Sequence, residues 1–172
     1  YATYFKDDQG DLPTDEEARQ VWLAQPGFVA SHLIHGGRKD NFWEMAETGP
    51  CGPCSEIHYD FGADFCNMQH VPGHVCEVNG DCSRIVEIWN NVFIQYNRTS
   101  PTNFQPLPKR HVDTGMGFER IVSIIQGVRG NYDTDLLKPL LDETQRLAGQ
   151  TDGERASNLT PYRVIADHVR AA

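Results

Sequence analysis

The chain has 172 residues, 39% of them hydrophobic, and 24 acidic residues against 15 Lys and Arg give it a formal net charge of −9. The length suits one domain of ~100–200 residues. The negative charge excludes a nucleic-acid binder of the basic-patch kind, whose pI usually exceeds ~9. No apolar run approaches the ~20 residues of a membrane-spanning helix, so no membrane partner is expected.

Five cysteines are an odd number, which argues against a complete disulfide framework and favours a reducing, cytoplasmic compartment. The mixed aromatic and charged residues at the start predict no signal peptide. The chain begins without Met and ends inside a helical pattern that has no capping Gly. We therefore expect a fragment of a longer protein.

The first half of the chain predicts short strands, one helix and many loops. Residues 1–5 are aromatic and β-branched, which is typical of a strand. An acidic run, Asp15-Glu16-Glu17, opens a predicted helix that ends near Ala24. Residues 25–54 are rich in Gly and Pro and predict loops around short strands. Residues 55–60 alternate as a strand does.

The second half predicts one long strand and then helices. Residues 61–82 form an irregular excursion, and the β-branched and aromatic run 84–98 predicts a central strand. Apolar residues from Phe118 to Ile125 share one helical face. A helix whose regularity Pro139 limits follows Asp133, then a polar loop over 149–158, then a last helix through Tyr162. This order predicts an α+β fold, an antiparallel sheet flanked by helices.

The tetrapeptide Cys51-Gly52-Pro53-Cys54 matches the active-site pattern of thioredoxin-like dithiol enzymes. That chemistry needs the first Cys at a helix N-terminus, where the dipole lowers the pKa of the thiol. A strand pattern follows here, and Gly49-Pro50 precedes. A rigid Gly/Pro turn near a site is therefore favoured over a redox centre.

The excursion carries a second group of cysteines and histidines. A structural zinc ion takes four N or S ligands in a tetrahedron. Zinc bound by the three cysteines and one histidine is one reading, and free thiols with surface histidines are the other. The candidate ligands are Cys66, His70, His74, Cys76 and Cys82.

The segment Asp113-Thr114-Gly115-Met116-Gly117 leads into the helix that begins near Phe118. Backbone N–H groups and the positive end of the helix dipole meet at such a turn. Arg120 follows on the first helical turn, where its guanidinium can hold phosphate oxygens bidentately. The pattern is neither the dinucleotide fingerprint nor a P-loop.

Several motifs occur in order and resemble the aminoacylation domain of the alanyl-tRNA synthetases, a family of class II synthetases. The resemblance covers essentially the whole chain, which is similar to the C-terminal part of that domain, including the segment known as class II motif 3. The motifs are Asp40-Asn41-Phe42-Trp43-Glu44-Met45, residues 48–57, Glu87-Ile88-Trp89-Asn90, residues 92–98, Leu107-Pro108, residues 113–120 and residues 131–136.

The resemblance implies a role for each matching residue. Arg120 would contact the phosphates of ATP, and Asp113 would hold the amino group of alanine, so these two carry the catalytic assignment. Glu87 would bind Mg²⁺. The remaining alanine-binding positions implied are Trp43, Asn90, Val92 and Gly115.

The implied activity is that of an alanine–tRNA ligase, which activates alanine with ATP to alanyl-adenylate and transfers it to tRNA(Ala). The partners implied are alanine, ATP, Mg²⁺, tRNA(Ala) and the rest of the same synthetase chain; zinc is an additional candidate cofactor. An editing function elsewhere is implied too, because a methyl pocket discriminates poorly.

One departure limits this expectation. The family's motifs 1 and 2 have no match, so residues 1–172 would be a partial class II core that contains the 61–82 insertion. We expect the isolated chain not to activate alanine. Two alternatives stay open, a non-catalytic synthetase-derived binding module and a dithiol or zinc-binding domain.

Overall fold

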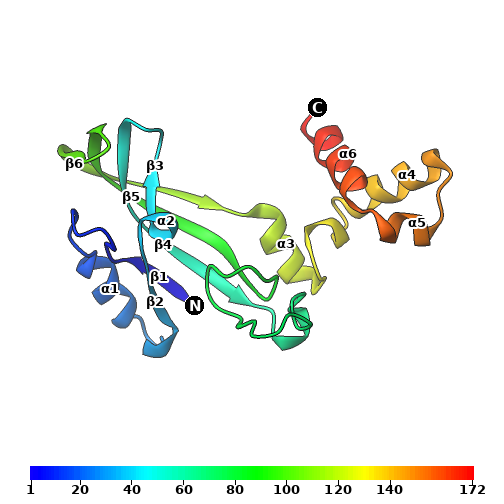
Figure 1. Cartoon of the computed structure of the whole chain (residues 1–172), viewed down its shortest axis with the longest axis horizontal. Helices are drawn as coiled ribbons and strands as arrows, with labels where there is room; N and C mark the ends of the chain where they lie inside the picture. The colour runs from blue at the N-terminus through cyan, green and yellow to red at the C-terminus, as the bar shows by residue number, and fades with distance from the viewer. The chain divides into compact units, whose positions relative to one another are not determined.

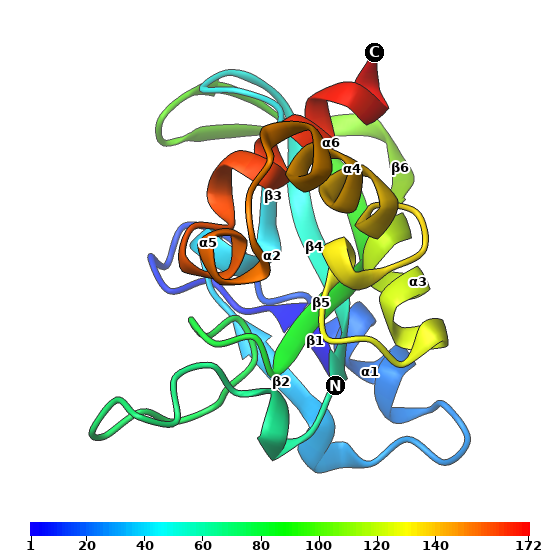
Figure 2. The same ribbon diagram turned by 90° about the vertical axis from the view of Figure 1, so that its right-hand side faces the viewer.

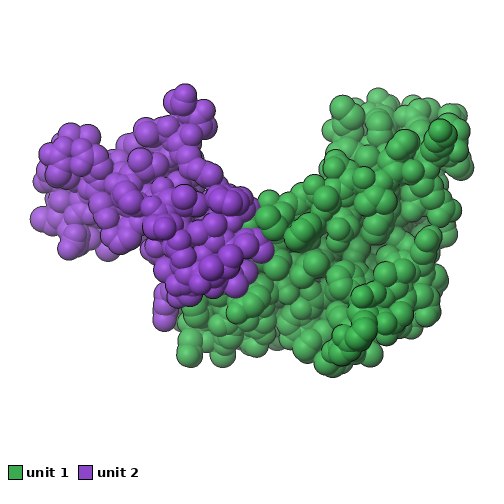
Figure 3. Space-filling view, turned by 180° about the vertical axis from the view of Figure 1, so that it is seen from behind, with its two compact units in different colours: residues 1–117 green, residues 118–172 purple.

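A computed structural model describes residues 1–172. It divides into two compact units, Tyr1–Gly117 and Phe118–Ala172, coloured green and purple in Figure 3. The first unit holds the sheet, and the second is helical. No helix in either unit is both long enough and apolar enough to cross a bilayer.

The first unit is built on a six-stranded sheet with the order β2-β1-β4-β5-β6, in which β3 also pairs with β4. Every strand pairing in this sheet is antiparallel except that of β1 with β2. The predicted antiparallel α+β architecture is thus confirmed, with one parallel pair at an edge. The strands, drawn in Figure 1, are β1 (Ala2–Phe5), β2 (Leu33–Gly36), β3 (Phe42–Glu44), β4 (Gly49–Asp60), β5 (Ile85–Ser100) and β6 (Asn103–Met116).

Helix α1 (Glu16–Leu23) contacts the sheet through the Trp22 side chain. Asp15 caps it by accepting a hydrogen bond from the Ala18 backbone N–H at 2.9 Å. The Trp22 indole N–H donates to the Ser55 hydroxyl on β4 at 2.7 Å. This bond fixes α1 on the face of the sheet that carries Ser55. A second, short helix, α2 (Arg38–Asn41), precedes β3.

The core of this unit lies where β1, β3 and β4 meet. Phe5, Phe42 and Cys51 are buried there, and Tyr96 and Phe104 pack against them. The rings of Phe5 and Phe42 lie 5.2 Å apart at their centroids, in a tilted arrangement that suits aromatic pairs. The cluster fixes the end of β4 at which the Cys-Gly-Pro-Cys motif lies.

That motif is part of β4, so the prediction of a turn at residues 51–54 is wrong. Its residues pair with β3 on one side, Phe42 opposite Pro53 and Trp43 opposite Gly52. On the β5 side the register shifts between Cys51 and Cys54. A bulge of this kind accommodates a proline, which cannot donate a ladder hydrogen bond.

Residues 61–84 leave the sheet between β4 and β5, and their only helical element is the 3₁₀ turn Ala63–Phe65 (Figure 2). The irregular excursion is confirmed. Arg84 closes its base by donating to both carboxylate oxygens of Asp60, at 2.7 and 2.8 Å. These hydrogen bonds from Arg84 hold the pKa of Asp60 below its usual value.

The second unit packs α4 against α6 around Leu137, Leu141, Tyr162 and Ala166. The predicted loop over 149–158 contains a short helix, α5, which corrects that expectation. The helices of this second unit are α3 (Phe118–Gln126), α4 (Lys138–Ala148), α5 (Asp152–Ser157) and α6 (Thr160–Ala171), with a 3₁₀ turn at Asn131–Asp133.

Helix α5 forms in a polar segment because its N-terminus is a capping box. The Thr151 hydroxyl accepts from the Glu154 N–H, and the Glu154 carboxylate accepts from the Thr151 N–H at 2.7 Å. We expect Thr151→Ala to destabilise this unit by about 1 kcal/mol in urea unfolding. Ser157→Ala, at the other end of the helix, is the control. Equal stability of Thr151→Ala and the wild type would contradict the role of the cap.

Candidate active site

Strands β5 and β6 bring four of the predicted alanine-binding residues together. In the register of this pair, Asn90 lies opposite Gly115 and Val92 lies opposite Asp113. Cross-strand partners share one face of a sheet, as do residues two apart on one strand. The four positions therefore form a compact square on a single face.

Glu87 joins the same face because β5 contains an irregularity at Ile88. Glu56 pairs with Asn90, and His58, two residues further along β4, pairs with Glu87. The register shifts between Ile57 and His58, so one extra residue on β5 turns Glu87 to the side of Asn90. Simple alternation would place it on the opposite face.

The side chain of Asn90 presents a buried acceptor. Its amide hydrogen-bonds the Cys54 thiol, whereas its Oδ1 atom is buried and accepts no hydrogen bond from the protein. Buried polar atoms are almost always paired, and an exception at a site points to a ligand. A donor such as an ammonium group would satisfy this oxygen.

Val92 and Asp113 differ in exposure although they are neighbours. Val92 is only 8% exposed, whereas Asp113 is exposed and accepts a hydrogen bond from the Thr114 N–H at 2.8 Å. The Trp89 indole N–H donates to the Thr114 hydroxyl across the strand pair. The pair thus places a methyl-sized apolar surface beside an accessible carboxylate.

Beside this square, on the same face of the sheet, lies a buried polar network on β4 that the sequence did not indicate. The Glu56 carboxylate accepts from the Thr3 hydroxyl at 3.2 Å and from the Asn79 amide at 3.1 Å, and the His58 Nε2 atom lies 3.1 Å from it. Glu56 and His58 are both buried. A carboxyl group held by several partners can serve as rigid support for the neighbouring strand β5.

Trp43 lies on β3, opposite Gly52 and half-buried. Gly52 is two residues before Cys54, which pairs with Val92 on β5. Trp43 is therefore on a strand that pairs with β4, one strand removed from β5, which carries Asn90 and Val92. Its position is compatible with the wall of a small pocket, and the assignment stays a prediction.

Arg120 belongs to the helical unit, on the first turn of α3, where it is half-buried. Its backbone carbonyl accepts from the Ser123 hydroxyl at 2.7 Å. The predicted helix through Phe118 and Ile125 is confirmed. The phosphate-binding role of Arg120 stays a prediction.

The two cysteines of the Cys-Gly-Pro-Cys motif are unsuited to dithiol exchange. Both are buried free thiols within a strand. Burial, reinforced by the negative charge of Glu56, raises the pKa of Cys54 to about 12, and burial also raises the pKa of Cys51. A thiol that does not ionise near neutral pH is a poor nucleophile. The structure therefore disfavours the oxidoreductase alternative.

The excursion brings four of its five candidate ligands together. One ligand atom from each of Cys66, His74, Cys76 and Cys82 lies within 4.8 Å of all the others. The Cys76 Sγ atom is 3.6 Å from the His74 Nε2 atom. His70, the other candidate histidine, is exposed and outside the group.

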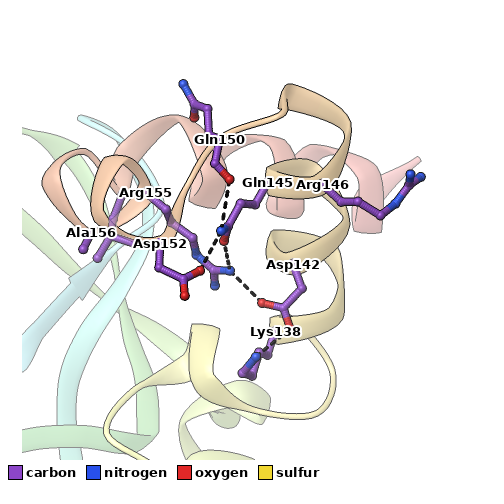
Figure 4. Close-up of a pocket in the computed structure, with 9 residues that line it drawn as sticks. Lys138, Asp142, Gln145, Arg146, Gln150, Asp152, Arg155 and Ala156 are labelled. Atoms are coloured by element: carbon purple, nitrogen blue, oxygen red, sulfur yellow. Dashed lines mark hydrogen bonds and ion pairs between the residues drawn. The ribbon is translucent and has the colours of Figure 1, made fainter.

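Two larger hollows lie away from these residues. A cavity of about 500 Å³ lies between α1 and the sheet face that carries Ser55, Asn91 and Phe93. In the helical unit, a hollow of about 610 Å³ is lined by charged groups that pair with one another, as Arg155 does with Asp142 at 2.6 Å (Figure 4). None of the predicted site residues lines either hollow.

Comparison with known proteins decides the family. The sequence profile of tRNA synthetases class II (A) matches residues 1–172. The chain belongs to the class II tRNA synthetases. The antiparallel sheet with a Gly-rich approach to α3 is the part of the class II core that this chain supplies.

Its relatives among class II synthetases include alanine–tRNA ligases. The chain is 48% identical over 172 residues to one from Chlorobium chlorochromatii, and 99% of the chain but 18% of the relative is covered. It is 48% identical to the cytoplasmic enzyme of Drosophila melanogaster over 99% of the chain and 18% of the relative. It is 45% identical to the mitochondrial enzyme of Saccharomyces cerevisiae over 99% of the chain and 17% of the relative. The chain thus spans less than a fifth of these relatives.

Proposed function

We propose that this class II chain forms part of the alanine-activating site of an alanine–tRNA ligase. The observation that carries the proposal is the register of β5 and β6, which pairs Asn90 with Gly115 and Val92 with Asp113. The alanine–tRNA ligase relatives support the amino-acid assignment. The Tyr1–Gly117 unit would supply the alanine pocket.

The chemistry of alanine fits the square of residues. Its ammonium group would be held by the Asp113 carboxylate and by the Asn90 Oδ1 atom, which accepts no other hydrogen bond. Its methyl group would lie against Val92. Gly115 would leave room for the backbone of the substrate, since a Cβ there would meet nothing within 4 Å.

In the proposed reaction, the alanine carboxylate attacks the α-phosphorus of ATP. A new O–P bond forms, the bond to pyrophosphate breaks, and alanyl-adenylate and pyrophosphate result. Catalysis of such a step depends on positioning and on stabilising charge. Arg120 would hold phosphate oxygens, and Glu87 would hold Mg²⁺, for which carboxylate oxygens are suitable ligands.

The partner of the second step would be tRNA(Ala), and the rest of the synthetase chain would complete the site. We place the protein in the cytoplasm because its five cysteines are free thiols. Fractionation of cells that express the intact protein tests this placement. Enrichment in an organelle fraction would contradict it.

A methyl pocket predicts limited selectivity. Shape alone supplies about 1–3 kcal/mol against an amino acid that lacks one methyl group. We expect kcat/KM in ATP–pyrophosphate exchange by the intact protein to be about 10–200-fold lower for glycine than for alanine, with serine also activated weakly. Exchange that ignores alanine, or no exchange at all, would favour the non-catalytic binding module.

A further inference from the structure

We propose that Cys66, His74, Cys76 and Cys82 form a structural zinc site that holds the excursion between β4 and β5. The four ligand atoms already converge to within 4.8 Å of one another, from positions spread over 17 residues of the chain. This site is separate from the proposed alanine pocket. Its test therefore does not depend on the enzymatic activity.

The donor set matches the chemistry of zinc. Three thiolates and one imidazole in a tetrahedron are a common structural arrangement, with Zn–S near 2.3 Å and Zn–N near 2.0–2.1 Å. Such a tetrahedron requires S···S separations of about 3.8 Å and S···N separations of about 3.6 Å. The Cys76 Sγ to His74 Nε2 distance of 3.6 Å already meets this requirement.

The surroundings of the group also suit a metal–thiolate centre. Cys66 and Cys82 are buried although the segment between them contains only turns and irregular backbone, with no helix or strand. Zinc with three thiolates carries one net negative charge. The Arg84 guanidinium, fixed by Asp60, hydrogen-bonds the Cys76 side chain and would balance it.

The clamp would also support β4 beside the proposed alanine pocket. Asn79 lies between the ligands Cys76 and Cys82 and donates to the buried Glu56 carboxylate at 3.1 Å. Glu56 pairs with Asn90 across β4 and β5. Ordering of the excursion by zinc would hold Asn79 in place against this network.

The test is the zinc content of the intact protein purified without added metal. We expect Cys76→Ser and His74→Ala, both at half-buried positions, to contain one zinc per chain fewer than the wild type. The control His70→Ala, in the same excursion but outside the group, should retain the wild-type content. Equal zinc content in the wild type and Cys76→Ser would overturn the proposal.

Cobalt gives an independent readout that does not require a folded variant. The chelated wild-type protein reconstituted with Co²⁺ should show the intense visible bands of a tetrahedral site and a thiolate charge-transfer band, and His70→Ala should show the same. A weak octahedral spectrum in the wild type would contradict three-thiolate ligation. So would rapid titration of the Cys66, Cys76 and Cys82 thiols in the native, metal-replete protein.

Discussion

Replacement of Asp113 by Ala in the intact protein should raise the KM for alanine by about 10–150-fold. The Asp113 carboxylate is the charged partner proposed for the substrate ammonium, and it lies opposite Val92 on the paired strand. A hydrogen bond to a charged group is worth about 1.5–3 kcal/mol, and each 1.4 kcal/mol is a factor of ten. Steady-state ATP–pyrophosphate exchange at varied alanine measures the effect.

Two further variants show that the effect is specific. Glu17→Gln removes an equal charge from α1, where Glu17 forms an exposed ion pair with Arg110 on the face of the sheet opposite the proposed pocket. This variant should leave the KM for alanine and the KM for ATP unchanged. Arg120→Ala should raise the KM for ATP rather than that for alanine. An unchanged KM for alanine in Asp113→Ala would remove this residue from the pocket.

Gly52→Ala should destabilise the sheet unit by at least about 2–3 kcal/mol, since overpacking against a backbone atom forces the strands apart. A Cβ atom at Gly52 would lie 1.9 Å from the Phe93 carbonyl oxygen on β5. Neither atom belongs to a flexible side chain, so the bulge between Cys51 and Cys54 has to open. Urea unfolding of the chain, followed by near-UV circular dichroism, measures the loss.

Gly115→Ala is the matched control for Gly52→Ala. It adds the same methyl group to the neighbouring strand pair, but nothing lies within 4 Å of the new atom. Its stability should stay within about 0.5 kcal/mol of the wild type, whereas the proposed pocket predicts weaker alanine binding. Equal stability of Gly52→Ala and Gly115→Ala would contradict the close approach of β4 and β5.

The elements with a strong apolar pattern could be predicted from the sequence. The β-branched run of β5 and the periodic faces of α3 and α6 are of this kind. Strand β6 could not be predicted, because most of its residues are exposed and Pro106 and Pro108 interrupt its pattern. It becomes a strand through its pairing with β5, which is a tertiary effect.

In the candidate site too, some features could be predicted from the sequence and others depend on tertiary contacts. Asn90 and Val92 were implied by the family resemblance and lie two residues apart on β5, so they share a face, and the register adds Asp113 and Gly115. In the sequence, the polar residues Glu56 and His58 alternate with Ile57 and Tyr59, a pattern typical of a strand with Glu56 and His58 facing solvent. In the structure, Glu56 and His58 are buried and Tyr59 is exposed. Hydrogen bonds from distant residues such as Thr3 permit this inversion, and no local pattern indicates them.

The central claim is that the face carrying Asn90 and Asp113 binds alanine. A crystal structure of the intact protein with a non-hydrolysable alanyl-adenylate analogue tests it most directly. The distance to measure joins the ammonium nitrogen of the ligand to the nearer Asp113 carboxylate oxygen. We predict about 2.7–2.9 Å, as in other charge-assisted bonds, with the methyl group against Val92. An ammonium group held elsewhere, or a ligand on the opposite face of the sheet, would contradict the claim.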